Sequence, residues 1–143
     1  MSVAGRHPHF VSPHFWHTTL ADGLVDARES KRAVLLVVGR QSCGGSRALV
    51  EKTIAKEEIH EYLDAHYVCV ASDADAPEPA VAALIAQMAQ HERTPLCLYV
   101  SADEKLLHST SGGRPAAVFL SDLLEAPHRA RQATATAPSS RPF

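Results

Sequence analysis

Cysteine is scarce in this chain of 143 residues, and its three copies do not fall at the spacing of a disulfide framework. Cys69 and Cys97 lie inside apolar runs, while Cys43 alone lies in a polar loop, a distribution typical of a reducing compartment. Long apolar runs are also missing. The longest, Ala33 to Val38, is too short for a signal peptide or a membrane span. We therefore expect a cytoplasmic protein without a membrane partner.

The chain also lacks an excess of basic residues. It carries 14 Lys and Arg against 16 Asp and Glu, which gives a net charge of −2, and the basic residues are scattered. Such a surface does not suit a phosphate backbone, so we expect no nucleic-acid partner. Hydrophobic residues make up 45% and charged residues 21%, and the length suits a single domain with an ordinary core.

The N-terminal segment, residues 1–15, is predicted to be a flexible arm because its prolines disfavour a helix. Histidines and prolines alternate in and just after it: His7, Pro8, His9, Pro13, His14 and His17. A metal site is the alternative, but this spacing fits no known ligand set and no cysteine or carboxylate pattern accompanies it. We expect no metal.

Residues 16–126 are predicted to form one α/β domain. Trp16, Leu20, Leu24 and Ala27 recur at helical spacing and predict an amphipathic helix from Trp16 to about Lys31. The continuous apolar run from Ala33 to Val38 predicts a strand that is buried on both faces.

The remainder of this domain alternates between helical and extended patterns. We expect a helical region over 46–66 that is interrupted near residue 55, a strand at 67–71, a helix from about 81 to 90, a strand at 96–100, an antiparallel return strand at 106–110, and a last helix after Pro115. The first two strands should be parallel, with helices on both faces of a mixed sheet. The tail, 127–143, has no periodicity and is predicted to be disordered.

Cys43 follows the first strand at the point where the next helix should begin. Backbone N–H groups at a helix start favour a thiolate, so Cys43 is the candidate nucleophile. Arg40 and Arg47 flank it and are candidate contacts for an anionic partner such as glutathione; two solvated surface arginines are the plainer alternative.

The order of elements, with Cys43 at a strand-to-helix junction and Thr94-Pro95 before the third strand, resembles the thioredoxin fold. Bacterial thioredoxin-like domains show a Cys-x-x-Cys, a Met-Glu-x-x-Ser/Thr-Phe stretch, an acidic helix start, and an Asn-x-x-Phe-Val before a strand that ends in Asp. The corresponding segments here are Cys43-Gly44-Gly45-Ser46, Leu49-Val50-Glu51-Lys52-Thr53-Ile54, Glu57-Glu58-Ile59, Asp64-Ala65-His66-Tyr67-Val68 and Asp73.

The resemblance implies a cis proline at Pro95 that faces Cys43, with the Thr94 backbone free to pair with an extended substrate. The chain departs from the family in three ways. Ser46 replaces the second cysteine, no carboxylate lies in the strand where thioredoxins place a buried acid, and Ser42 precedes Cys43 where Trp is common. Gly44 and Gly45 should leave the sulfur open to approach. The four residues from Cys43 to Ser46 also resemble the Cys-Gly-Phe-Ser of monothiol glutaredoxins, some of which share an iron–sulfur cluster with glutathione.

Two functions follow from these patterns. In the first, the chain is a monothiol redox protein in which Cys43 exchanges disulfides, Ser46 supports the thiolate, and glutathione or a partner thiol completes the reaction without any bound cofactor. In the second, the chain is a non-catalytic thioredoxin-fold module that binds a protein through the face formed by Cys43 and Pro95, or through another surface. The cysteine favours the first function, and the missing second cysteine, buried acid and Trp favour the second.

Overall fold

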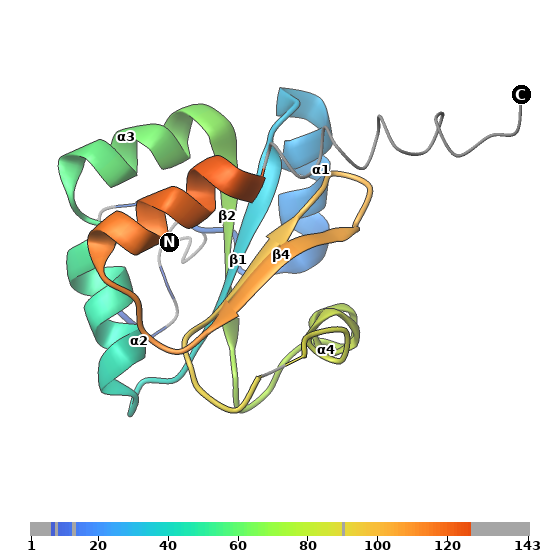
Figure 1. The fold of residues 1–143 in the computed structure, drawn as a ribbon. Helices are drawn as coiled ribbons and strands as arrows, with labels where there is room; N and C mark the ends of the chain where they lie inside the picture. Colours follow the sequence, from blue (N-terminus) through green and yellow to red (C-terminus); the bar gives the residue numbers. More distant parts are fainter. Residues whose placement is uncertain (1–6, 8, 13, 90, 127–143) are drawn as a thin grey trace, which may run out of the picture.

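A mixed β-sheet forms the centre of the molecule. The computed structural model describes residues 7, 9–12, 14–89 and 91–126, and within them the sheet has four strands in the order β2-β1-β3-β4 (Figure 1). The strands are β1 (Ala33–Gly39), β2 (Tyr67–Asp73), β3 (Leu96–Val100) and β4 (Leu106–Ser111). β1 is parallel to β2 and antiparallel to β3, and β3 is antiparallel to β4. This is the mixed sheet of the predicted thioredoxin fold.

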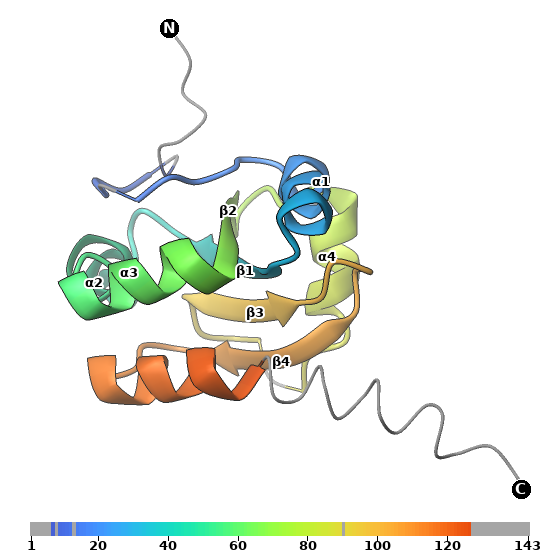
Figure 2. The same cartoon turned by 90° about the horizontal axis from the view of Figure 1, so that it is seen from above.

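Helices cover both faces of this sheet, as expected. They are α1 (Leu20–Ser30), α2 (Gly44–Ala48), the π-helical segment η1 (Leu49–Thr53), α3 (Glu57–His66), α4 (Pro79–Ile85) and a last helix over residues 116–126. Figure 2 shows α2, α3 and the last helix on one side of the strands and α1 and α4 on the other. None of the described helices has the length and apolar content needed to cross a membrane.

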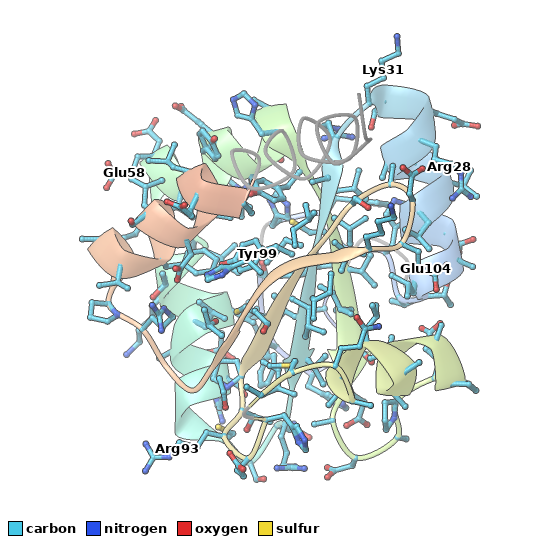
Figure 3. All side chains as sticks on the ribbon, turned by 45° about the vertical axis from the view of Figure 1, so that its right-hand side comes forward. Arg28, Lys31, Glu58, Arg93, Tyr99 and Glu104 are labelled. Carbon is cyan, nitrogen blue, oxygen red and sulfur yellow. The ribbon has the colours of Figure 1, made fainter. Side chains whose placement is uncertain are left out.

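The core is split in two by the sheet, because successive side chains of a strand point to opposite faces. In β1, Leu35 and Val37 pack beneath η1, α3 and the last helix, whereas Val34, Leu36 and Val38 pack beneath α1 and α4. All five side chains are fully buried, which explains why this strand reads as an uninterrupted apolar run. On the first face, Tyr99 of β3 points into the interior (Figure 3).

The first helix begins later than its periodicity predicts. α1 starts at Leu20, and Thr19 caps it by accepting a hydrogen bond from the Asp22 N–H at 3.2 Å. Trp16 is fully buried, as its place in the pattern implies, but it lies in an extended segment. His17 bridges β2, donating from its N–H to Cys69 O at 2.9 Å and accepting from the Ala71 N–H at 2.8 Å.

Two other boundaries differ from or refine the prediction. α4 ends at Ile85 rather than near residue 90, because the next N–H groups, of Gln87 and Met88, turn back to Leu84 and Ile85. The helical region over 46–66 is interrupted as expected. Its break comes after η1, and α3 restarts after Lys56, which has extended backbone dihedrals.

The segment before α1 packs against the first core face where the structure describes it. His7, Phe10 and His14 have exposed fractions of only 5%, 6% and 3%. Residues 9–12 and 14–17 are named the strap below. The predicted tail at 127–143 lies outside the described residues.

Candidate redox site at Cys43

Cys43 lies between the end of β1 and the start of α2. Its N–H donates to Arg40 O at 2.9 Å, which closes the turn after the strand, and its carbonyl accepts the first helical hydrogen bond from Arg47 N at 3.1 Å. The backbone of Cys43 is extended, as befits the residue that caps a helix start. The side chain is half-buried, so the sulfur is partly shielded from water but can still be reached from solvent.

The sulfur contacts the residue that precedes Pro95. Cys43 Sγ lies 3.2 Å from the carbonyl oxygen of Thr94, and the Thr94–Pro95 peptide bond is cis. The contact follows from strand order: β3 is antiparallel to β1 with Val38 paired to Leu96, so the start of β3 lies beside the end of β1. The predicted site residues on the two segments are therefore brought together.

The two glycines after Cys43 have different surroundings. A side-chain carbon on Gly45 would lie 3.4 Å from Pro95 Cδ and 3.5 Å from Thr94 O, so Gly45 packs against the cis proline. Around Gly44 such a carbon would meet nothing within 4 Å. Gly44 therefore faces open space, whereas Gly45 is the glycine packed near the sulfur and the cis proline.

The environment of Cys43 lowers its thiol pKa to about 7 from an ordinary value of 9.0. Partial desolvation opposes ionisation, but hydrogen bonds from the Ser46 and Thr94 side chains and from the Ser46 and Gly45 backbone outweigh it. In the neutral form the thiol donates to Thr94 O, which favours retention of the proton. Several groups donate hydrogen bonds to the sulfur and only one accepts from it, so the thiolate is stabilised relative to the thiol.

Ser46 occupies the place of the missing second cysteine and is fully buried. Its Oγ accepts a hydrogen bond from Arg40 N at 3.4 Å and its side chain supports the Cys43 sulfur. A serine hydroxyl remains protonated at neutral pH, so Ser46 stabilises a thiolate but cannot attack a disulfide.

Both flanking arginines pair with carboxylates. Arg40 Nε lies 2.8 Å from Asp75 Oδ1, and Arg47 Nε lies 3.6 Å from Glu51 Oε2, one helical turn away. Neither guanidinium is among the groups that lower the Cys43 pKa. Their contact with an anionic partner stays a prediction.

A hollow opens beside Thr94. It has a volume of about 260 Å³ and its lining includes Val38, Arg40, Ile85, His91, Thr94 and Leu96. A second hollow, of about 400 Å³, shares Arg40 and is lined by the loop residues Gln41 and Ser42 together with His9 and Asp75. Cys43 lines neither hollow itself: the first reaches Thr94, which contacts the sulfur, and the second reaches Ser42, the residue before Cys43.

The other two cysteines are buried and inert by comparison. Burial raises the pKa of the Cys97 thiol to about 12 and raises that of Cys69 further. All three cysteines are free. The expectation that Cys69 and Cys97 are small core side chains agrees with their exposed fraction of 2% each.

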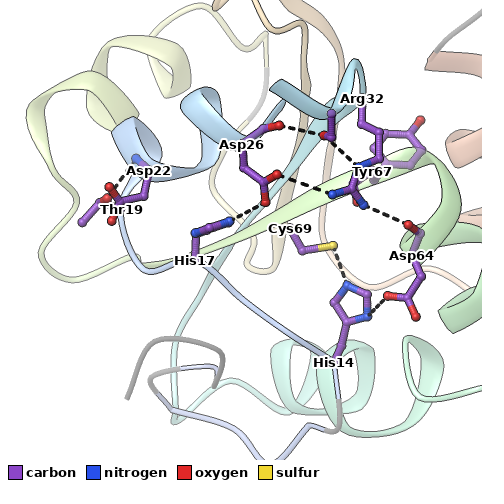
Figure 4. A network of polar contacts seen from close by, with 10 residues as sticks. His14, His17, Thr19, Asp22, Asp26, Arg32, Asp64, Tyr67 and Cys69 are labelled. Atoms are coloured by element: carbon purple, nitrogen blue, oxygen red, sulfur yellow. Dashed lines mark hydrogen bonds and ion pairs between the residues drawn. The ribbon is translucent and has the colours of Figure 1, made fainter. Parts of the chain in front are cut away.

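A second polar cluster lies on the strap and was not found from the sequence. His14 lies between Cys69 of β2 and Asp64 of α3, and the nearby His17 pairs with Asp26 at 2.8 Å (Figure 4). His60, four residues before Asp64, also contacts His14. The spacing of His60 and Asp64 on one helix face was the available signal.

The fold and the cysteine beside a cis proline define a thioredoxin-type domain. The family model described as thioredoxin-like matches residues 15–102, so the chain belongs to the thioredoxin-like family. A comparison with curated protein sequences gives no match.

Solved structures show the same fold at low sequence identity. A thioredoxin from Thermus thermophilus is similar with a TM-score of 0.62 and 20% identity, over 76% of this chain and 83% of that one. A putative disulphide-isomerase from Bacteroides thetaiotaomicron has a TM-score of 0.61 and 14% identity, over 86% and 93%. The C-terminal domain of DsbD from Neisseria meningitidis has a TM-score of 0.58 and 17% identity, over 74% and 90%.

Proposed function

We propose that this chain is a monothiol thiol–disulfide exchange protein with Cys43 as its nucleophile. The observation that supports this most directly is the half-buried Cys43 thiol, whose pKa is lowered to about 7 and which contacts Thr94 beside the cis Pro95. A thiol with that pKa is substantially ionised at neutral pH, and the thiolate is the reactive form.

The reaction has two exchange steps. The Cys43 thiolate attacks one sulfur of a disulfide R–S–S–R′, forms the mixed disulfide Cys43–S–S–R and releases R′–S⁻. Because Ser46 cannot resolve this intermediate, an external thiolate attacks the R sulfur, leaves with R in a new disulfide and regenerates the Cys43 thiolate. Glutathione is the proposed external thiol, and no bound cofactor is required.

The proposed partner binds the face formed by Cys43, Thr94 and Pro95. An extended segment next to Thr94 can pair with its backbone, while a side chain or the glutathione moiety occupies the hollow of about 260 Å³. Arg40 lines both recesses and is the proposed contact for a carboxylate. We place the protein in the cytoplasm, where three free cysteines stay reduced.

Mass spectrometry after treatment with glutathione disulfide tests the proposal. We expect one glutathione adduct on Cys43, its release by excess reduced glutathione, and no adduct in Cys43→Ser. A glutathionylated peptide should then be reduced catalytically in the presence of glutathione. Failure of wild type to form an adduct at pH 7, in protein that melts normally, overturns the proposal.

A non-catalytic binding module is the second candidate. The observations that favour it are the serine at position 46 and the wholly apolar β1 strand, which offers no acid for proton transfer. In that case a protein partner would bind wild type and Cys43→Ser equally well, whereas a partner of the redox protein would be trapped only through Cys43.

A further inference from the structure

Three side chains that can ligate a metal ion converge away from the redox site, where the strap meets α3. They are His14, His60 and Asp64, and one donor atom from each lies within 4.8 Å of the others. His60 and Asp64 are four residues apart and so project from the same face of α3. His14 comes from the strap, which runs beside β2.

The two distances from His14 suit a small ion with tetrahedral coordination, while the third contact joins the other nitrogen of His60 to the other oxygen of Asp64, Nε2 to Oδ2 at 3.3 Å. His14 Nδ1 lies 3.0 Å from His60 Nδ1 and 3.4 Å from Asp64 Oδ1. Around a Zn²⁺ ion with bonds of about 2.0–2.1 Å, neighbouring tetrahedral ligand atoms lie about 3.3–3.4 Å apart. The two protein distances fall near this value without any rearrangement of the backbone.

The outer contact of His14 is also the one that a metal ligand needs. Its Nε2 lies 3.0 Å from Cys69 Sγ in the core, which fixes the plane of the ring. With Nδ1 on a metal, Nε2 carries the proton and donates a hydrogen bond to the sulfur, a weaker acceptor in the place of the carboxylate or carbonyl that usually fixes a ligating histidine. The contact with Cys69 thus fixes the buried His14 ring so that its Nδ1 faces His60 and Asp64.

The opposite side of the cluster is open. The Asp64 side chain is 57% exposed and that of His60 is 32% exposed, against 4% for His14. An ion can therefore enter from solvent and keep a water molecule in its fourth position. Ligand set, spacing, an outer partner and an entry path are the features expected of a metal site.

We propose that His14, His60 and Asp64 form a site for a divalent transition-metal ion, with Zn²⁺ the best match to two imidazoles and one carboxylate. The ion ties the strap to α3 and stabilises the docked strap. From the sequence alone we expected no metal, because the spacing of the N-terminal histidines fits no known ligand set. The two partners of His14 come from α3 and meet it only in the folded protein.

Titration with Co²⁺ alone, as a spectroscopic substitute for Zn²⁺, tests the site. The full chain without a purification tag is used in a Cys43→Ser background, so that the reactive thiol cannot bind the ion. We expect one Co²⁺ per chain with visible absorption typical of tetrahedral coordination, and its displacement by Zn²⁺. Zn²⁺ should raise the melting temperature and slow hydrogen exchange at the His17 and Ala71 amides.

Matched variants on α3 separate this site from adventitious binding. We expect His60→Gln and Asp64→Asn to weaken Zn²⁺ binding by more than about tenfold, while His66→Gln, an exposed histidine on the same helix, leaves it unchanged. Melting without metal confirms that each variant folds. Absence of saturable binding, or equal losses in His60→Gln and His66→Gln, would show that the cluster is only a hydrogen-bonded contact.

Discussion

Cys43 Sγ lies 3.2 Å from Thr94 O although the two residues are 51 positions apart in the chain. The contact exists because β3 runs antiparallel beside β1, so that the loop after one strand meets the residues before the other. It holds the sulfur beside the cis Thr94–Pro95 bond while the groups that begin α2 donate hydrogen bonds to it. The reactivity of Cys43 therefore depends on both segments, and this dependence can be measured.

The rate of alkylation of Cys43 should follow the ionisation of its thiol. With a pKa of about 7, the rate should reach half its maximum near pH 7, two units below that of an ordinary cysteine at 9.0. Removing the hydroxyl in Ser46→Ala removes one hydrogen bond to the thiolate and should raise the apparent pKa by about one unit. Iodoacetamide kinetics measure this, with Cys69 and Cys97 as unreactive internal controls. A wild-type midpoint at pH 9 would contradict the assignment.

Replacing Ser46 by cysteine should restore the missing half of a dithiol site. The Ser46 side chain is within hydrogen-bonding reach of the Cys43 sulfur, so a thiol there is placed to attack a mixed disulfide. We expect Ser46→Cys to form an intramolecular disulfide and to reduce disulfide substrates without glutathione. The double variant Cys43→Ser/Ser46→Cys is the control and should remain inactive. An oxidised Ser46→Cys protein without the internal disulfide would refute the geometry.

Gly23 is required where α1 approaches β2. A Cβ at this position would overlap Val70 Cγ2, inside the packed core. Gly23→Ala should therefore lower the free energy of unfolding by about 1–3 kcal/mol, although alanine is the better helix former. Gly44→Ala is the matched control: it adds the same methyl group where nothing lies within 4 Å and should change stability by less than about 0.5 kcal/mol. Urea unfolding of both variants measures these changes in the free energy of unfolding.

The buried His7 should make the protein less stable in mild acid. Burial, with a smaller contribution from His9, lowers the pKa of His7 to about 4 from 6.5. Between these values the unfolded chain takes up a proton that the folded chain excludes, so stability should fall as the pH drops from about 6.5 to about 4.

The single tryptophan provides the readout for this effect. Trp16 is fully buried and its ring centroid lies 5.2 Å from that of His7. Urea unfolding is followed by Trp16 fluorescence at several pH values. The free energy of unfolding should change less steeply with pH in His7→Gln than in wild type. His91→Gln, at an exposed position, should keep the wild-type slope. Equal slopes in all three proteins would exclude a role for His7.

Local patterns predicted most of the fold. The apolar run of β1, the proline before the last helix and the break in the 46–66 region each depend on neighbouring residues, and each is found in the structure. The start of α1 was wrong because Trp16 fits the helical period while belonging to the extended strap. Thr19, a good capping residue three positions before Asp22, was the signal that marked the true start.

By itself the sequence determined the order of helices and strands, the thioredoxin-like character, and Cys43 as the one cysteine in a polar loop. Periodicity, capping and turn residues act over short distances, and a single sequence displays them directly. Only the tertiary structure decided which distant side chains meet. The contacts of Cys43 with Thr94 and of His14 with His60 span 51 and 46 positions. They depend on the order of the strands and on the docking of the strap, which no local pattern encodes.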